Sequence, residues 1–186
     1  MRAFLAIELP DALKTRLVEV AKRLGSSRAP VLWTRPGNMH LTLRFLGDVS
    51  DEQGRQLSDY LAGEYNGFER FQLNIAGIGV FPNPRAPRII WAGVYCSDAS
   101  LERVQHIAEQ GAQRIGLKPE KRAFRPHLTI GRVRQSRKTG SDFRRLLDLE
   151  HDFDGGRIDV LEVSLFSSEL KPSGAEHTRI ACFALS

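Results

Sequence analysis

Cysteine is scarce in this chain, with two residues among 186. Cys96 and Cys182 are far apart, and neither belongs to the Cys-x-x-Cys pairs that hold zinc. Each lies in an apolar, strand-like stretch, so we expect small buried thiols in a reducing compartment. The pattern also argues against a catalytic cysteine.

Long hydrophobic runs are missing as well. No apolar stretch approaches the roughly 20 residues that a membrane-spanning helix needs. The first ten residues, MRAFLAIELP, are apolar but interrupted by Glu8, and they lack the long apolar core and small-residue cleavage site of a secretory signal. We therefore read them as a first strand and expect a cytoplasmic protein that does not engage a membrane.

Three common catalytic fingerprints are also absent from the sequence. There is no G-x-x-x-x-G-K-[ST] loop for a nucleoside triphosphate, and no G-x-G-x-x-G after a strand for a dinucleotide. There is no G-x-S-x-G elbow of a serine hydrolase. Any chemistry on nucleotides must therefore use another device.

Positive charge is present in excess and is unevenly placed. The formal net charge is +5, yet the segment from Arg114 to Arg145 holds eleven basic residues against two acids, Glu120 and Asp142, a net of +9. Such a block is either a solvated surface or a site for a phosphate-bearing partner. The eleven basic residues are Arg114, Lys118, Lys121, Arg122, Arg125, Arg132, Arg134, Arg137, Lys138, Arg144 and Arg145.

Expected strands and helices interleave along the chain. Apolar residues at helical spacing predict a helix that opens at Pro10-Asp11 and ends at Gly25. The short connections PNPRAP and KPSGAEH indicate hairpins between their flanking strands. We expect strands over 40–46 and 127–133 and one long strand over 157–170. These features predict an α+β fold. Because a similar strand recurs in each half of the chain, we expect two pseudo-symmetric lobes, each an antiparallel sheet with helices packed outside, around a central cleft. Residues 1–186 would form this single bilobal domain.

The strand that recurs carries the tripeptide His-Leu-Thr, at residues 40–42 and 127–129. Because residues i and i+2 of a strand share a face, His40 and Thr42 point the same way, as do His127 and Thr129. A histidine titrates near neutral pH and can give or take a proton. A threonine hydroxyl can bind a phosphate oxygen.

Two such units facing each other would supply one acid, one base and two phosphate clamps for metal-free phosphodiester hydrolysis. A single His-x-Thr is common by chance, and a lone strand histidine is more often structural; two copies are a stronger signal. No Asp, Glu or His lies at ligand spacing from His40 or His127 on its strand, so we expect no metal. We read His106, His151 and His177 as surface or capping residues.

At these residues the sequence resembles the two-histidine phosphoesterases, and among them the bacterial and archaeal RNA 2',3'-cyclic phosphodiesterases, also named 2'-5' RNA ligases. The stretches HLTLRFLGDV and FRPHLTIGRV resemble the family's two HxTx motifs. GVFPNPRAPRIIWAGV and VLEVSLFSSELKPSGAEHTRI resemble later segments, so the similarity runs nearly end to end.

The resemblance implies a hydrolase of RNA processing that opens a terminal 2',3'-cyclic phosphate to a 2'-phosphate, with reversible, ATP-independent 2'-5' joining as a related reaction. It implies no cofactor and no metal. His40 would be the proton donor and His127 the proton acceptor, although the residues alone leave these roles interchangeable. Thr42 and Thr129 would hold the phosphate. The expected partners are RNA ends with a cyclic phosphate, tRNA fragments among them, and we expect a monomer.

The resemblance also assigns a phosphate-binding arginine to Arg132. Strict alternation, however, puts Arg132 on the face opposite His127 and puts Gly131 on the site face, where it would leave room for a ligand. Alternation also places Arg44 beside Thr42, as a phosphate contact or as a surface charge. Phe45 would then belong to the core, with base stacking as the alternative.

Two other functions are compatible with the sequence. One is a nucleotide- or RNA-binding module without turnover, although binding alone does not need two proton-transfer groups. The other is an enzyme of the same superfamily that acts on a small cyclic nucleotide or an ADP-ribose derivative. The basic segment favours polymeric RNA over these small substrates.

Overall fold

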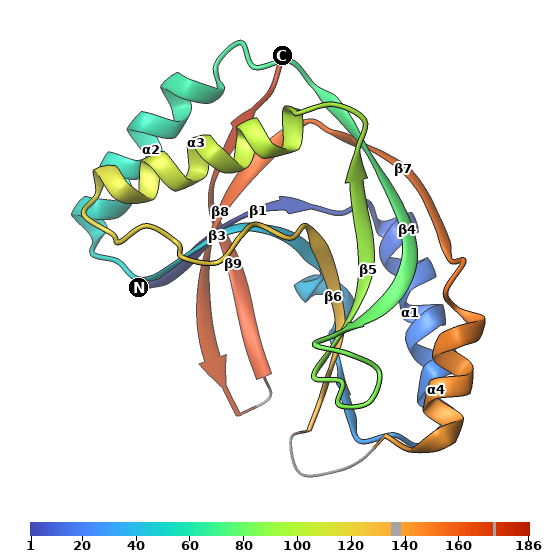
Figure 1. The fold of residues 1–186 in the computed structure, drawn as a ribbon. Coiled ribbons are helices and arrows are strands. Elements are labelled where there is room, and N and C mark those ends of the chain that lie inside the picture. The colour runs from blue at the N-terminus through green and yellow to red at the C-terminus, as the bar shows by residue number, and fades with distance from the viewer. Residues whose placement is uncertain (135–138, 173) are drawn as a thin grey trace.

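The computed structural model describes residues 1–134, 139–172 and 174–186, which form one curled antiparallel sheet and four α-helices (Figure 1). Arg137 and Lys138 of the basic segment lie outside the described residues. The elements are β1 (Arg2–Glu8), α1 (Asp11–Gly25), β2 (Val31–Trp33), the 3-10 turn η1 (Pro36–Asn38), β3 (His40–Asp48), α2 (Asp51–Tyr65), β4 (Phe71–Phe81), β5 (Ile89–Cys96), α3 (Ser100–Arg114), β6 (His127–Val133), α4 (Gly140–Leu149), β7 (Asp154–Val160), β8 (Glu162–Lys171) and β9 (Gly174–Ala184).

The sheet consists of two four-stranded halves that meet in the middle. The strand order is β7-β4-β5-β6-β3-β1-β8-β9, and β2 pairs with the side of β6. We call β9-β8-β1-β3 the first half-sheet and β6-β5-β4-β7 the second. They are joined where β3 pairs with β6, through the single Cα pair Leu41–Leu128. The expected α+β fold is confirmed, and the two expected sheets are two halves of one continuous sheet.

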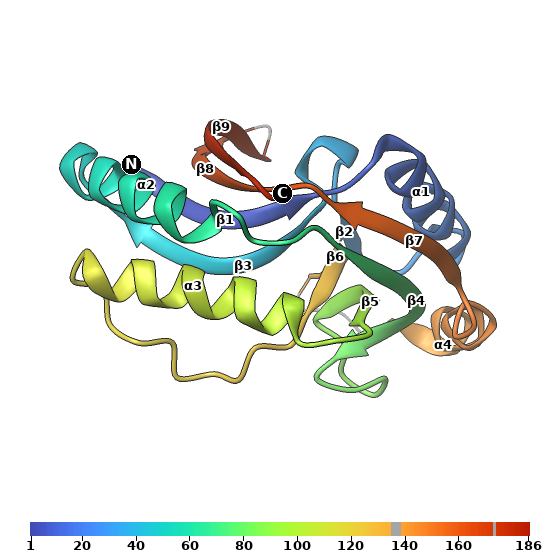
Figure 2. The same ribbon diagram turned by 90° about the horizontal axis from the view of Figure 1, so that it is seen from above.

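The helices cross over between the two halves. Helix α3 follows β5 in the chain but packs on β3 and against α2, whereas α1 follows β1 but packs on β6, β7 and α4. Figure 2 shows the resulting pairs, α2 with α3 on one side and α1 with α4 on the other. Each helix has an apolar face suited to this burial; Leu13, Leu17 and Leu24 of α1, for example, are buried. The two halves of the chain therefore interlock.

Most of the expected elements are confirmed, including the hairpins β4–β5 and β8–β9. The long strand expected over 157–170 is wrong, because Leu161 separates β7, which pairs with β4, from β8, which pairs with β1. The expectation of two buried thiols is also wrong: Cys96 is half-buried and Cys182 is exposed on the outermost strand β9. No helix of the described chain is long and apolar enough to cross a membrane.

Candidate active site

The two His-Leu-Thr tripeptides lie side by side at the junction of the half-sheets. Leu41 of β3 pairs with Leu128 of β6 in antiparallel register, and both leucines are buried. One residue to either side of this pair, the same register places His40 beside Thr129 and Thr42 beside His127. These four side chains lie on the face opposite the leucines, which we call the inner face. The structure therefore brings together the four residues singled out in the sequence, and they are half-buried.

Each of these two strands has a β-bulge directly after its threonine. Along β1, Ala6 pairs with Thr42, but the next residue back, Leu5, pairs with Arg44, so Leu43 is the extra residue. Along β5, Trp91 pairs with Thr129 and Ile90 pairs with Gly131. An extra residue on one strand reverses the alternation of all residues beyond it. The expectation of strict alternation is therefore wrong in both strands, and at equivalent positions.

Because of the bulges, four residues lie on the face of the sheet opposite to the expected one: Arg44, Phe45, Gly131 and Arg132. Arg132 pairs with Ile89, which shares a face of β5 with Trp91 and Gly93, the partners of Thr129 and His127. Arg132 is therefore on the inner face with the histidine, and it is exposed. Its contact with phosphate stays a prediction.

Phe45 occupies the equivalent inner position on β3. It pairs with Phe4, and the two ring centroids are 6.1 Å apart. The side chain is 60 % exposed, so the expectation that Phe45 belongs to the core is wrong. Two unlike side chains, an aromatic ring and a guanidinium, thus stand at matching places beside the two histidines.

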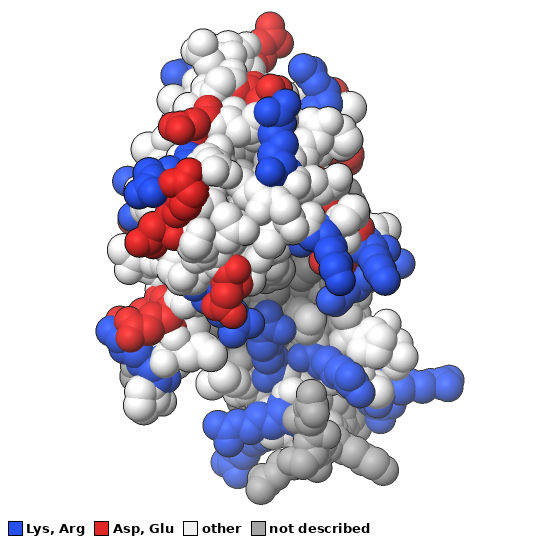
Figure 3. Space-filling model, turned by 90° about the vertical axis from the view of Figure 1, so that its left-hand side faces the viewer, with Lys and Arg blue, Asp and Glu red and all other residues white. Residues whose placement is uncertain are grey.

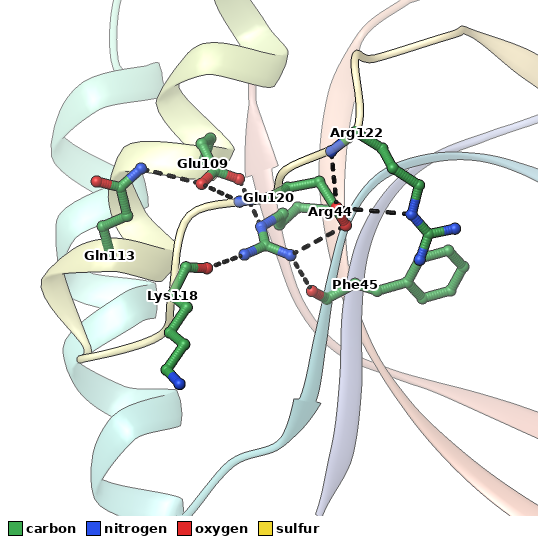
Figure 4. Close-up of polar contacts among 7 residues, drawn as sticks. All are labelled: Arg44, Phe45, Glu109, Gln113, Lys118, Glu120 and Arg122. Carbon is green, nitrogen blue, oxygen red and sulfur yellow. Dashed lines mark hydrogen bonds and ion pairs between the residues drawn. The ribbon is translucent and has the colours of Figure 1, made fainter.

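Arg44 lies on the other face of β3, against α3. Its side chain is 9 % exposed, and its Nε lies 2.6 Å from Oε2 of Glu109. Its Nη1 donates to the carbonyl oxygen of Phe45 at 2.8 Å, and its Nη2 donates to that of Lys118 at 2.7 Å (Figure 4). The guanidinium is thus engaged away from His40 and Thr42, and these contacts give no support to a phosphate-binding role, which stays an untested expectation.

Gly131 makes room for a side chain of the protein. A Cβ atom built there would lie 2.8 Å from Cε3 of Trp33 and 2.8 Å from Cγ1 of Val31. Gly131 is buried on the face opposite His127. The expectation that it leaves space for a ligand is therefore wrong.

His40 is enclosed by aromatic rings of the first half-sheet. Its ring stacks on Phe4 with centroids 4.7 Å apart, and Phe4 in turn stacks on Phe166 of β8 at 5.3 Å. His177 of β9 meets His40 edge-on at 5.5 Å. Burial lowers the pKa of His40 to about 4, and a charge on His177 acts in the same direction, while a hydrogen bond with the backbone of Asn38 opposes both.

His177 is a site neighbour that the sequence did not reveal. We expected a surface or capping residue, but its ring is half-buried and lies 4.9 Å from Phe4. Burial also lowers the pKa of His177. Its position depends on the pairing of β9 with β8 and of β8 with β1, which no local sequence pattern reports.

Glu8 is a second neighbour found only in the structure. It pairs with His40 across β1 and β3, so the two side chains share the inner face. Its Oε1 accepts a hydrogen bond from the Ser164 hydroxyl at 3.0 Å and from Arg179 at 3.1 Å. Arg179 also binds Glu162 at 2.8 Å. The Glu8 carboxylate, on the same face as His40, is thus held by Ser164 and by an arginine that it shares with Glu162.

His127 stands in a more open setting. Its Nδ1 lies 2.7 Å from the carbonyl oxygen of Arg125, and Phe81 meets its ring edge-on at 5.3 Å. A pocket of about 450 Å³ adjoins it, with Phe81, Trp91 and Phe124 among the lining residues. Because a carbonyl oxygen only accepts, Nδ1 must carry a hydrogen, which leaves Nε2 of neutral His127 free to accept a proton.

Comparisons with known proteins agree with this geometry. Residues 7–91 and 95–175 match the model of the LigT-like phosphoesterase family. An RNA 2',3'-cyclic phosphodiesterase of Methanothermobacter thermautotrophicus is 35 % identical over 185 residues, which covers 100 % of this chain and 99 % of that protein. One of Archaeoglobus fulgidus is 30 % identical, covering 98 % of this chain and 99 % of that protein.

Solved structures with the same fold superpose on the whole of this chain. A protein of Thermus thermophilus superposes with a TM-score of 0.82 at 25 % identity, covering 100 % of this chain and 98 % of that chain. Escherichia coli LigT in complex with 3'-AMP superposes with a TM-score of 0.79 at 26 % identity, with the same coverage of 100 % and 98 %. The chain described here therefore belongs to the LigT-like phosphoesterase family.

Proposed function

We propose that this protein is an RNA 2',3'-cyclic phosphodiesterase that hydrolyses the terminal cyclic phosphate to a 2'-phosphate. One observation carries the proposal: the pairing of Leu41 with Leu128 sets two His/Thr pairs against each other on one face of the sheet. The full-length relatives named RNA 2',3'-cyclic phosphodiesterase support the substrate class. Residues 1–186 would act as one catalytic domain, working as a monomer.

The reaction needs one proton taken and one proton given. In the proposed mechanism, Nε2 of His127 takes a proton from a water molecule as the water oxygen attacks phosphorus. The bond from phosphorus to the 3'-oxygen breaks, and His40 gives that oxygen a proton. The product carries a 3'-hydroxyl and a 2'-phosphate, and each histidine exchanges its proton with solvent before the next cycle.

The threonines and Arg132 would bind the phosphate itself. Thr42 and Thr129 each stand beside the histidine of the other strand, so their hydroxyls can donate to the two non-bridging oxygens from both sides of the junction. The guanidinium of Arg132, on the same face, suits the extra negative charge that develops as water attacks. Escherichia coli LigT structures hold phosphate and 3'-AMP, which supports a phosphate site in this fold.

The surroundings of His40 fit a proton donor that becomes charged only with substrate bound. Its lowered pKa leaves it neutral near pH 7 in the free protein. A phosphate anion a few ångströms away favours the charged imidazolium and so raises the pKa. The phosphate would thus place a proton on His40, and burial of the ring, which disfavours the charged form, would help that proton pass to the leaving oxygen.

The same residues could also catalyse a reversible transesterification with another nucleophile. A 5'-hydroxyl in place of water would attack phosphorus, release the 3'-oxygen and form a 2'-5' linkage without ATP. The basic segment favours RNA ends, tRNA fragments among them, over small cyclic nucleotides. A binding protein without turnover remains the second candidate, but the paired proton-transfer groups favour an enzyme.

The test is an oligonucleotide that ends in a 2',3'-cyclic phosphate, incubated with the protein with and without EDTA. We expect a single product with a 2'-phosphate, identified by mass spectrometry and by its resistance to a 3'-specific phosphatase, at a rate that EDTA does not change. Tight binding without product would contradict the proposal and favour a binding module. A 3'-phosphate product would reverse the assignment of the leaving oxygen.

A further inference from the structure

We propose that the connection between α3 and β6, residues 115–126, is a track for the RNA backbone, held beside the active site by Arg44 and Glu109. We call this connection the strap. It would bind the phosphodiesters that precede the terminal cyclic phosphate, and so favour polymeric RNA over a mononucleotide. This inference rests on the proposed function and specifies how the same site recognises its substrate.

The buried guanidinium of Arg44 ties the strap to the sheet. Its Nη2 donates to the carbonyl oxygen of Lys118 at 2.7 Å, and its Nη1 lies 3.9 Å from Oε2 of Glu120. The same group contacts Glu109 of α3 at 2.6 Å. One side chain from β3 therefore meets the helix before the strap and two residues of the strap itself (Figure 4).

Other contacts fix the strap along its length. Oε1 of Glu109 accepts from the backbone N–H of Glu120 at 3.1 Å, and Gln53 of α2 donates to the carbonyl oxygen of Ile115 at 2.8 Å. Phe124 packs against the core. At the far end, the carbonyl oxygen of Arg125 orients His127 at 2.7 Å. The strap has no regular secondary structure, yet its backbone is held from α3 to the catalytic histidine.

These anchors leave three of the four basic side chains of the strap free for a partner. Glu120, the acid of this segment, is engaged by Arg44 and by the backbone N–H of Arg122, and the Arg122 Nε lies 3.8 Å from its Oε1. Lys118, Lys121 and Arg125 are exposed, and within the described chain no carboxylate forms an ion pair with any of them. With four basic residues and one acid, the strap has a net charge of +3.

The space-filling view places this charge near a hollow of the surface. The strap lies at the front in Figure 1 and therefore along the right-hand edge in Figure 3. In Figure 3, Lys and Arg gather along that edge and around the hollow in the lower half, whereas Asp and Glu concentrate above and to the left. A chain of phosphates entering the hollow from this edge would meet cations in succession.

The other half of the molecule shows that such anchoring is particular to the strap. The equivalent connection between α1 and β3 attaches itself by strand pairing, because β2 pairs with β6 from Val31 to Trp33. The strap is instead attached to β3 through the side chain of Arg44. Buried ion pairs contribute little net stability compared with apolar packing, so the contact serves to position the strap.

The experiment compares two substrates in the same enzyme variants. One is 2',3'-cyclic AMP, and the other is an oligoadenylate of about ten nucleotides that ends in a 2',3'-cyclic phosphate. The double variant Lys118→Ala/Lys121→Ala should lower the ratio of kcat/KM for the oligonucleotide to that for the mononucleotide about tenfold at low salt. Arg145→Ala, an exposed basic position on α4 in the same basic segment, is the matched control and should keep the wild-type ratio.

Salt dependence tests whether the strap binds phosphates. For the oligonucleotide, the slope of log kcat/KM against log salt concentration should become shallower by about 0.7 for each lysine–phosphate interaction removed, or about 1.4 in the double variant. An unchanged slope or an unchanged ratio would overturn the track. Inhibition by polyglutamate as strong as by an unreactive RNA of equal charge would also overturn it, in favour of an acidic polypeptide.

The anchor is tested separately with Glu109→Gln, which keeps the shape of the side chain and removes its charge. We expect the substrate ratio to fall in the same direction as in the double variant, with KM for the oligonucleotide rising and kcat for 2',3'-cyclic AMP little changed. A wild-type ratio in a folded Glu109→Gln protein would overturn the role of the anchor. If the wild-type protein opened neither substrate, the proposed function would fail, which is a different result from an unchanged ratio.

Discussion

Strands β3 and β6 follow the same backbone course but carry different side chains beyond their bulges. Both begin with His-Leu-Thr, and both gain an extra residue directly after the threonine. After the extra residue, the first position on the face of the leucines is Arg44 in β3 and Gly131 in β6. The first position on the inner face, with the histidines, is Phe45 in β3 and Arg132 in β6. The backbone thus defines equivalent places around the junction, and the side chains make the two sides chemically unequal.

The same inequality holds for the two histidines. His40 lies among Phe4, Phe166 and His177, whereas His127 borders an open pocket. Burial disfavours a charged imidazole, so the enclosed histidine holds a proton less readily than it would in water. A repeated motif can therefore supply unlike proton-transfer groups when its surroundings differ.

The largest expected effect comes from removing either histidine. His40→Ala and His127→Ala should each lower kcat/KM by about 10²–10⁴-fold, since each removes a general acid or base. A phosphodiester with a 4-nitrophenolate leaving group needs no proton donor. Steady-state rates with that substrate should therefore recover in His40→Ala but not in His127→Ala.

The matched control for this comparison is His151→Ala, because that side chain is 82 % exposed. It should behave as the wild type with both substrates. Recovery in His127→Ala in place of His40→Ala would reverse the two roles. Full activity of either site variant on the cyclic phosphate would contradict the proposed mechanism.

Acid should destabilise the folded protein through His40. The folded pKa is about 4 against 6.5 for the free side chain, so between these pH values the unfolded chain binds a proton that the folded protein does not. Stability therefore falls as the pH falls through this window, by up to about 3 kcal/mol. Denaturant unfolding of His40→Gln at pH 7 and pH 4 should show a smaller loss than the wild type.

A suitable control is His106→Gln, which replaces an exposed histidine on α3. Its unfolding free energy should follow the wild-type pH dependence. If His40→Gln lost as much stability as the wild type between pH 7 and pH 4, burial of His40 would not be the cause of the acid sensitivity.

Substitution of either threonine should reduce activity by a similar factor, because Thr42 and Thr129 occupy matching positions and carry the same hydroxyl. Thr42→Val and Thr129→Val each remove one hydroxyl donor, so each should lower kcat/KM by about 10²–10³-fold. Thr→Ser at either position should retain most of the activity because it keeps the hydroxyl. Losses that differ by more than about tenfold would show that one side of the junction dominates phosphate binding.

The smallest effect is expected at the unlike pair Arg132 and Phe45. Arg132→Gln should lower kcat/KM about tenfold, with partial recovery in Arg132→Lys, because charge is restored without the planar fork. Phe45→Leu should have less effect on kcat, since it removes no charge. Equal effects of the two changes on kcat would contradict the assignment of phosphate binding to Arg132.

The local patterns of the sequence predicted the elements and the positions of the histidines well. Strand β6 was predicted with its observed ends, and the helix that begins at Asp11 and ends at Gly25 follows its apolar periodicity. The shared face of His40 and Thr42 needed only the alternation of a strand. Such features depend on neighbours within a few residues of each other.

The features that were missed depend on partners far away in the chain. A bulge exists only relative to the opposite strand, so the positions of Arg44 and Phe45 could not follow from alternation alone. His177 of β9 reaches His40 of β3 through three strand pairings, β9 with β8, β8 with β1 and β1 with β3. The break at Leu161 separates two strands that pair in different halves of the sheet, and across it the buried positions change phase from Ile158 and Val160 to Val163 and Leu165. A single long strand over 157–170 ignores that change.

The crossing of the helices has a practical consequence for dividing the chain. The turn between β4 and β5 is exposed at residues 82–86, so it is a natural place to cut. Because α1 packs on β6 and α3 packs on β3, each fragment would lack the surface that covers its own helix. Neither piece should fold by itself, and both together should restore the enzyme, which makes this turn a candidate split point for a two-fragment complementation reporter.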